Sequence, residues 1–441
     1  MDAAADHIAA EFEALGLQPA GEEMGYFQTR ERSFTVLDGV PDLAIDDGGP
    51  SLVYREDFVE YPSFIFNSGE GRGEVRALTW GTLRETGARF GTFAALEDLD
   101  LAGDVVMLFY ENDLVHIRYR ECAGILIVVE DPRDLKRRRT LSARRRDWSK
   151  PTLWISEETA NRLLSGTDHT VASIRRADEN LDRDEVVDVY TGVTTSMGVP
   201  ASAYERAPVR HVLGQLPGQA ARIEGAPQAD AAKLDHQLVV VMAQYDAPPP
   251  TPDGSRYPAA NDNASGVAVM LEAIRALNES GYEPYRSFLF VAYSAEGQEG
   301  GEWAYPPEVE RFLEAKKGFS ENFEIEAVVD LRGLGAGKGK DVVISAGGSL
   351  RLADLMETAA DQMGVASHRS GEPIDLSIVF QEKELGESGQ EVPNVGLTWE
   401  GWSLTSRTPA DTLASVSRDK LEQAGRTASL ALMILGRERQ Y

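Results

Sequence analysis

The sequence predicts an α/β fold in which helices cover both faces of a mixed, mostly parallel sheet, with a β-rich domain inserted into it. Strand-like and helix-like segments alternate over residues 200–441, which is the pattern of a sheet flanked by helices. Short strands and turns dominate from about residue 50 to residue 190. A chain of 441 residues exceeds what one ordinary hydrophobic core holds, so two folded units are expected.

The composition narrows the class of protein. Hydrophobic residues make up 42% of the chain, as in a globular protein. The formal net charge of −28 argues against a nucleic acid partner and against adsorption to anionic membranes. No apolar run reaches the roughly 18 residues that a membrane-spanning helix needs. The single cysteine, Cys122, excludes an internal disulfide and is expected to be a small buried residue.

The first helix is expected over residues 3–16, where Ile8, Phe12 and Leu15 share one face and Gly16 is a suitable C-cap. The β-rich part contains three apolar runs that predict buried strands, at residues 104–110, 123–129 and 151–156. A helix is expected directly after the third run, over residues 157–164.

In the C-terminal part, residues 264–278 predict a helix whose start is capped by Asp262 or Asn263. Further strands are expected at 238–243, 287–293, 327–330, 341–345 and 395–399, and further helices at 350–363 and 419–435. Four acidic residues follow predicted strands, namely Asp246, Asp262, Glu296 and Asp330. Ligands of open α/β sheets gather at the carboxyl ends of the strands, so these acids mark a candidate site.

Two segments carry a family resemblance. Residues 238–246 read as a buried strand running into a polar loop, and Asn261-Asp262-Asn263-Ala264-Ser265-Gly266 opens a helix. Together they resemble the two-zinc aminopeptidase family, whose relatives include glutamate carboxypeptidase and the non-catalytic transferrin receptor. The resemblance implies a zinc-exopeptidase-like domain made of residues 1–49 and 196–441. It implies a protease-associated-like insert over residues 50–195.

The resemblance also implies roles for the acids. Asp246 matches the residue that orients the first zinc-binding His, and Asp262 matches the Asp that bridges the two zinc ions. Glu296 matches the catalytic base, and Asp330 matches the last ligand of the first zinc. Asp411 lies in a Thr-Pro-Ala-Asp-Thr stretch that matches the family's last motif.

Three ligand positions of the family hold residues that bind zinc poorly or not at all. Gln244 replaces the first His, Gly297 replaces the second Glu of a Glu-Glu pair, and Arg407 replaces the last His. Gln is a weak neutral donor, Gly has no ligand atom, and Arg does not lose its proton. Catalytic zinc needs about three protein ligands. We therefore expect no cofactor, with zinc as the cofactor if the site works in an atypical way.

Acids that have lost their metal ions repel one another unless another charge compensates them. We expect Arg407 to point at Asp262 or Glu296, because a guanidinium pairs well with carboxylates. We expect Gln244 to donate a hydrogen bond to Asp262 or Asp330. A shared proton on one acid, or a hard cation such as calcium, is the next option.

The sequence thus favours a peptidase fold that has lost zinc binding and hydrolysis and acts as a binding or structural module. The main alternative is an active metallo-aminopeptidase that removes N-terminal residues with an atypical metal site. A third reading is metal-free catalysis with Glu296 as base and Arg407 as the oxyanion partner.

The expected partner is a protein or peptide, and a homodimer is possible. The basic run at residues 136–146 predicts a solvated loop, or a docking site for an acidic partner or a second copy. The start of the chain lacks the features of a secretory signal, and a removed signal or anchor is plausible. Resemblance to relatives that are mostly exported implies an extracytoplasmic location.

Overall fold

The structure is a computed structural model that describes residues 2–61, 68–80, 99–137, 150–181, 185–223, 234, 236–294, 324–347, 349–370 and 393–438. The chain divides into two compact units. Unit 1 comprises Met1–Arg32, Ala207–Pro249 and Arg256–Tyr441, and unit 2 comprises Ser33–Arg206 and Pro250–Ser255. These divisions differ from the sequence-based boundaries at 50 and 195, because two long strands, β2 (Phe27–Leu37) and β10 (Ala201–Leu216), run through the points of division.

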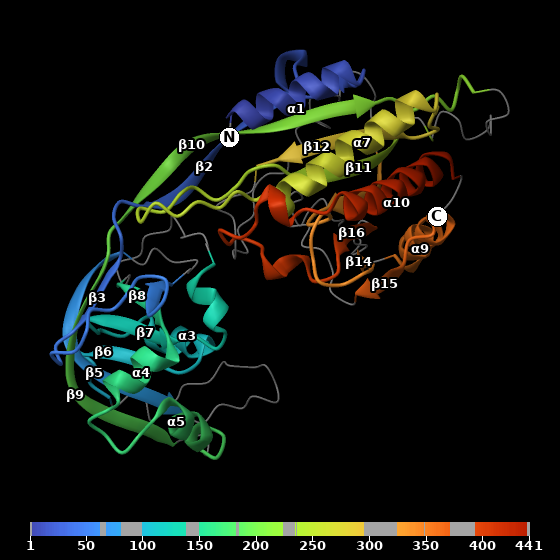
Figure 1. Ribbon diagram of the computed structural model, residues 1–441. Helices are drawn as coiled ribbons and strands as arrows, with labels where there is room; N and C mark the ends of the chain where they lie inside the picture. The colour runs from blue at the N-terminus through green and yellow to red at the C-terminus, as the bar shows by residue number, and fades with distance from the viewer. Residues whose placement is uncertain are drawn as a thin grey trace. The chain divides into compact units, whose positions relative to one another are not determined.

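Unit 1 is built on a mixed sheet that has nine strands in the described part of the chain (Figure 1). The strand order is β1-β10-β12-β11-β13-β16-β14-β15, with β2 paired to β10. The remaining strands are β1 (Gln18–Pro19), β11 (Gln237–Gln244), β12 (Ser287–Tyr293), β13 (Glu324–Leu331), β14 (Val342–Gly347), β15 (Ser367–Ser370) and β16 (Asn394–Trp399). The pairs β11–β12, β11–β13, β13–β16 and β14–β15 are parallel, whereas β10–β12 and β14–β16 are antiparallel.

The central strands β11 and β12 are buried along their whole length and are mostly apolar. Every residue of β11 and of β12 is buried, as is typical of parallel strands that are covered on both faces. Because β11, β12 and β13 run in the same direction, their carboxyl ends meet at one edge of the sheet. That edge carries the candidate site.

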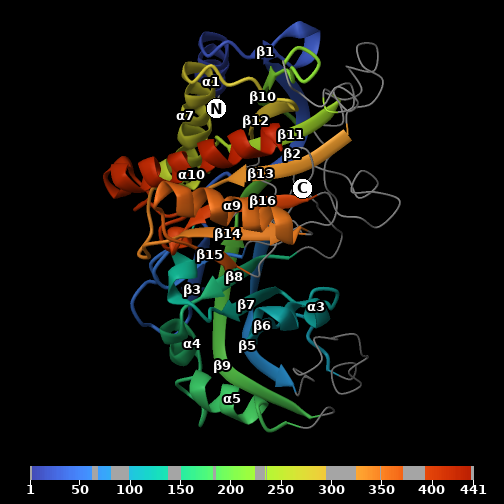
Figure 2. The same cartoon turned by 90° about the vertical axis from the view of Figure 1, so that its right-hand side faces the viewer.

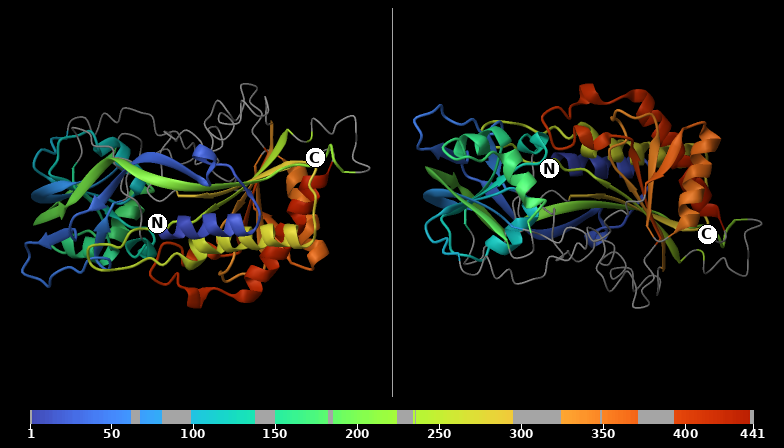
Figure 3. Two further views of the ribbon diagram at one scale, coloured as in Figure 1. Left: turned by 90° about the horizontal axis from the view of Figure 1, so that it is seen from above. Right: turned by 90° about the horizontal axis from the view of Figure 1, so that it is seen from below.

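Four helices of unit 1 lie along the sheet, namely α1 (Asp2–Ala14), α7 (Ser265–Glu279), α9 (Leu350–Met363) and α10 (Arg418–Arg437). In Figure 2, α10 lies between α7 and α9. Figure 3 shows α1, in blue, beside α7, where Glu11 pairs with Arg275 at 3.8 Å. The prediction of a mostly parallel sheet flanked by helices is therefore confirmed.

Unit 2 contains a second sheet with the order β3-β9-β5-β6-β7-β8-β4. Its strands are β3 (Asp42–Ile45), β4 (Phe58–Glu60), β5 (Gly69–Trp80), β6 (Val105–Leu108), β7 (Gly124–Val128), β8 (Thr152–Ile155) and β9 (Val186–Val199). Alternate strand residues enter two separate cores. Helices α4 (Glu157–Leu163) and α5 (Val171–Asp178) pack on one core, and α3 (Leu114–Ile117) packs on the other.

No helix among the described residues is long and apolar enough to cross a membrane. The helix expected over residues 3–16 is confirmed by α1 (Asp2–Ala14), and Gly16 follows it with a φ of +74°, as a C-terminal glycine does. Most of the basic run, residues 138–146, lies outside the described residues.

A buried arginine fastens the end of α10 to the sheet. Arg286 is 1% exposed. Its Nε donates to Gln237 Oε1 at 2.8 Å, and its Nη1 donates to the carbonyl of Leu435 at 2.9 Å and to that of Glu438. These bonds satisfy carbonyls at the end of the helix that have no intrahelical donor.

We predict that Arg286→Met lowers the free energy of unfolding by about 3 kcal/mol, because it leaves buried acceptors without a donor. Urea unfolding measures this loss. Arg351→Met is the control, because Arg351 also binds Glu438 but its side chain is 52% exposed. The control is expected to lose about 1 kcal/mol or less, and equal losses in the two variants would contradict the assignment.

Candidate functional site

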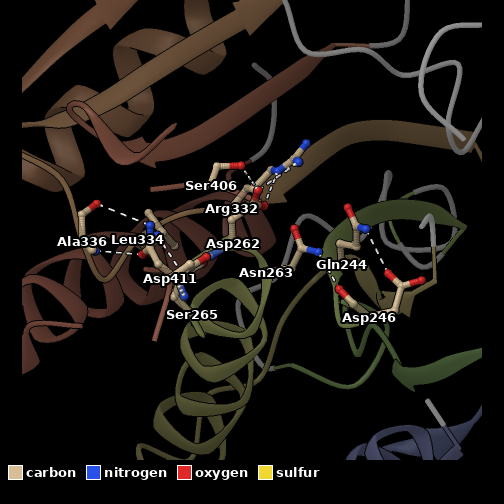
Figure 4. Close-up of polar contacts among 11 residues, drawn as sticks. Gln244, Asp246, Asp262, Asn263, Ser265, Arg332, Leu334, Ala336, Ser406 and Asp411 are labelled. Atoms are coloured by element: carbon tan, nitrogen blue, oxygen red, sulfur yellow. Dashed lines mark hydrogen bonds and ion pairs between the residues drawn. The ribbon is translucent and has the colours of Figure 1, made fainter. Parts of the chain in front are cut away.

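The site lies at the carboxyl edge of the unit 1 sheet, where several chain segments bring acids together. Gln244 ends β11 and Asp246 follows it, while Asp330 is the penultimate residue of β13. Asp262 lies in the bent segment Ala260–Ala264 that leads into α7. A loop after β16 adds Ser406 and Asp411, so the site draws on segments far apart in the sequence (Figure 4).

The carboxylate of Asp262 is bound through both of its oxygens. Its side chain is 1% exposed, and its Oδ1 accepts from Nε of Arg332 at 2.9 Å. Its Oδ2 accepts from the hydroxyl of Ser406 and lies 3.5 Å from Nη2 of Arg332. Figure 4 shows Arg332 and Ser406 both directed at this carboxylate. Both oxygens of Asp262 are therefore occupied by donors from the chain itself.

Arg332 reaches this position from the end of β13, two residues after Asp330. Its guanidinium lies over the ring of Trp402, 5.0 Å from the ring centre, an arrangement that stabilises a cation. Burial works against the charge of Arg332, but Asp262 outweighs it and the pKa of Arg332 is raised. The guanidinium consequently stays charged at every pH at which the chain is folded.

Asp411 holds the backbone around Asp262. Its Oδ1 accepts from the backbone N–H of Asn261 at 2.7 Å, and its Oδ2 accepts from that of Asp262 at 2.9 Å. Burial raises the pKa of Asp411, against the effect of these two hydrogen bonds. The carboxyl group thus acts as a clamp on the bend, where Asp262 has φ −109° and ψ 87°.

The bend itself corrects an expectation about the helix start. Neither Asp262 nor Asn263 caps α7, whose N-cap position is Ala264 without a side-chain hydrogen bond. Asn263 instead donates through Nδ2 to the carbonyl of Asp246 at 2.7 Å. Asn261 accepts through Oδ1 from the backbone N–H groups of Gly335 and Ala336, each at 2.7 Å. The side chains of Asn261 and Asn263 thus join three loops, because each bonds to backbone groups that are far away in the sequence.

Gln244 and Asp246 form a second group beside the first. Nε2 of Gln244 donates to Oδ1 of Asp246 at 2.9 Å, and the hydroxyl of Ser294 donates to Oδ2 at 2.6 Å. All three residues are buried. Gln244 was expected to donate to Asp262 or Asp330. The structure gives it Asp246 instead, because the two side chains flank the same strand end and Asp262 already has Arg332.

Asp330 differs from the other acids because one of its oxygens has no donor. Within the described residues, its Oδ1 is buried without a hydrogen-bond partner. Burial raises the pKa of Asp330 to about 6, which the charge of Arg332 only partly offsets and the charge of Asp262 reinforces. Asp330 consequently binds a proton more readily near neutral pH than an ordinary aspartate does.

The remaining predicted site residues have different outcomes. Glu296, the expected base, lies outside the described residues together with Gly297. Arg407 follows Ser406 in the loop and has a φ of +55°. The guanidinium that the structure places on Asp262 belongs to Arg332 rather than to Arg407. Arg332 was not among the site residues predicted from the sequence, although an Arg two residues after a strand-end Asp lies on the same side of a strand and was a usable signal.

The donors of the described site do not match a site for two zinc ions. Asp262 offers no oxygen that is not already bound, and Gln244 turns its amide group to Asp246. No group of three or more His, Cys, Asp or Glu residues in the described parts of the chain has the geometry to hold a metal ion. Among the described residues of the site, Oδ1 of Asp330 and Oδ1 of Asn263 are buried oxygens without a hydrogen-bond partner.

Part of the chain matches a known family of peptidases. Residues 223–431 match the family described as Peptidase family M28. The fold is similar to that of an aminopeptidase from Aneurinibacillus sp. strain AM-1, with a TM-score of 0.62 and 15% identity over 99% of this chain and 88% of that one.

Two further solved structures are similar in fold. A Peptidase M28 precursor from Shewanella amazonensis matches with a TM-score of 0.57 and 14% identity over 99% of this chain and 88% of that one. A zinc aminopeptidase from Bacillus subtilis matches with a TM-score of 0.54 and 15% identity over 100% of this chain and 90% of that one.

The ion pair between Asp262 and Arg332 predicts that removing the arginine alone destabilises the chain more than changing both residues. Arg332→Met leaves a buried carboxylate uncompensated and is expected to lower the free energy of unfolding by about 3 kcal/mol. Adding Asp262→Asn in the same chain is expected to restore most of that loss. Urea unfolding of the two single variants and the double variant measures the coupling. If the losses of the single variants add, the two side chains do not depend on each other.

The raised pKa of Asp330 predicts a pH dependence. The folded state holds this proton more tightly than the unfolded chain, whose carboxyl has its ordinary pKa of 3.8. The stabilisation is therefore complete below about pH 4 and is lost as the pH rises through about 6. Asp330→Asn is expected to gain up to about 3 kcal/mol over the parent between pH 4 and pH 7.

Unfolding free energies of Asp330→Asn and of the parent, measured across that pH range, test this expectation. Asp361→Asn, at an exposed position of α9, is the control and is expected to follow the parent. A constant difference between Asp330→Asn and the parent from pH 4 to pH 7 would show that Asp330 is ionised throughout.

Proposed function

Because the chain belongs to Peptidase family M28 through residues 223–431, we propose that it keeps the aminopeptidase fold as a binding or structural module and has lost two-zinc hydrolysis. The single observation that carries this proposal is the pairing of Asp262 with Arg332. Asp262 matches the residue that would bridge two metal ions. In this chain it is bound by a guanidinium and a hydroxyl.

Electrostatics makes that pairing hard to reconcile with bound zinc. A divalent ion at Asp262 would lie within a few ångströms of the fixed charge of Arg332, and like charges at such distances repel strongly in a buried site. To admit the ion, the guanidinium must leave both Asp262 and the face of Trp402. Zinc would then find carboxylates but, at the matched ligand positions, no imidazole or thiolate.

Several polar groups around Asp262 are also paired within the chain, which supports a site that keeps its shape without a metal ion. Asp246 receives hydrogen bonds from Gln244 and Ser294, and Asp411 receives two from the backbone. A network whose members satisfy one another is rigid and well defined. Such a rigid surface suits recognition of a partner, for which we propose a protein or peptide in an extracytoplasmic setting.

One observation favours the alternative of an atypical metallo-aminopeptidase with zinc as its cofactor. Oδ1 of Asp330 is buried and has no hydrogen-bond partner among the described residues, which is a feature of positions that hold a ligand. Under that alternative, Glu296 would supply the base. The alternative differs from our proposal in requiring bound metal.

The proposal is tested by zinc analysis and by turnover of aminoacyl chromogenic substrates. We expect the purified chain, incubated with zinc and then dialysed, to retain no stoichiometric metal. We expect substrate release to equal the background of Glu296→Gln, because no metal-bound water is present for Glu296 to activate. Stoichiometric zinc, with chelator-sensitive turnover that disappears in Glu296→Gln, would establish the alternative.

A further inference from the structure

The chain between Asp246 and Asn263 forms a strap whose middle lies in a different unit from its ends. We use the word strap for residues 247–262. Residues 250–255 belong to unit 2, although the residues on either side of them belong to unit 1. The strap therefore leaves the candidate site, enters unit 2 and returns directly to Asp262.

The two ends of the strap are closed by hydrogen bonds at the site. Nδ2 of Asn263 donates to the carbonyl of Asp246 at 2.7 Å, which joins the residue before the strap to the residue after it. The backbone N–H groups of Asn261 and Asp262 are held by Asp411 at 2.7 and 2.9 Å. Displacement of the strap is thus expected to act first on these bonds.

The middle of the strap is a tight turn ordered by Asp253. Its Oδ1 accepts from the hydroxyl of Thr251 at 2.5 Å and from the backbone N–H of Ser255 at 3.0 Å. Its Oδ2 accepts from the hydroxyl of Ser255 at 3.0 Å. Gly254 has a φ of +84°, which suits glycine. Thr251 is only 4% exposed, whereas Asp253 and Gly254 are exposed.

Arg55 anchors this turn within unit 2. Its Nε lies 3.6 Å from Oδ2 of Asp253, and its Nη2 lies 3.8 Å from Oε1 of Glu60. Its Nη1 donates to the carbonyl of Lys136 at 3.3 Å. Arg55 is 8% exposed and lies over the ring of Tyr54, 5.1 Å from the ring centre. The anchor is therefore a buried arginine held from several sides.

Backbone strain lies at both the anchor and the returning limb of the strap. Arg55 has a φ of +68° and Ala259 has a φ of +53°. Residues other than glycine rarely adopt this left-handed conformation, which costs about 1–3 kcal/mol and persists only where surrounding contacts impose it. Ala259 directly precedes the segment that carries Asn261 and Asp262. Loss of the anchor is thus expected to relax the backbone beside the site.

We propose that the strap couples unit 2 to the candidate site, so that the hold of Arg55 on Asp253 sets the order of the backbone at Asn261 and Asp262. A ligand or protein that displaces Arg55 or the turn loosens the clamp made by Asp411. This coupling does not depend on whether the site hydrolyses peptides, because it concerns the backbone and not the chemistry.

Hydrogen exchange of the full chain tests the coupling at its far end. In Arg55→Met and in Asp253→Asn, the amides of residues 257–264 are expected to exchange about five-fold faster. That factor corresponds to the roughly 1 kcal/mol of a partly exposed ion pair. Exchange in β7 is expected to stay unchanged, because β8 separates β7 from β4, the strand that carries the Arg55 partner Glu60.

Arg162→Met is the matched control. Arg162 also belongs to unit 2, and its Nη2 pairs with Oδ1 of Asp47 at 2.6 Å, but neither residue is part of the strap. The proposal is overturned if residues 257–264 exchange at the parent rate in Asp253→Asn, or if Arg162→Met accelerates them equally. If Arg55→Met also speeds amide exchange in β7, its effect is not confined to the strap. The result for Asp253→Asn alone then decides whether the coupling exists.

Discussion

The buried ion pair between Asp262 and Arg332 is the constraint on which the arrangement of the site depends. The bend before α7 puts Asp262 among the carboxyl ends of the strands, where a carboxylate that is 1% exposed requires a compensating charge. Arg332 supplies that charge from the neighbouring end of β13, and Trp402 and Ser406 hold the pair in place. The charge of an arginine side chain differs from that of a bound metal ion in two respects. It needs no ligand geometry and is not removed by dilution or by a chelator.

Most of the surrounding polar groups bond to one another or to the backbone. Gln244 and Ser294 donate hydrogen bonds to Asp246. Both carboxyl oxygens of Asp411 accept from backbone N–H groups of the bend. These contacts fix the loops at one edge of the sheet and leave Asp330 as the carboxyl group with an oxygen that lacks a partner among the described residues. The chain between Asp246 and Asp262 includes a turn, residues 250–255, that belongs to unit 2 and contacts Arg55 there.

Much of the fold was predictable from the sequence because it is periodic. The apolar runs of β11 and β12 and the helical spacing of α7, α9 and α10 match the observed elements within a few residues. The positions of Asp246 and Asp330 at strand ends also follow from that pattern. The partners of the acids were harder to predict, since they join residues far apart in sequence. A motif match favoured Arg407 as the cation, whereas the pleat of β13 delivers Arg332, and the turn at Asp253 gave no sign of its contact with Arg55.

The most direct test of the account is X-ray diffraction from crystals of the full chain grown with zinc, with data collected on both sides of the zinc absorption edge. The account predicts a guanidinium on Asp262 and no anomalous peak beside Asp262 or Asp330. Two anomalous peaks bridged by Asp262, with Arg332 turned away from it, would contradict the account.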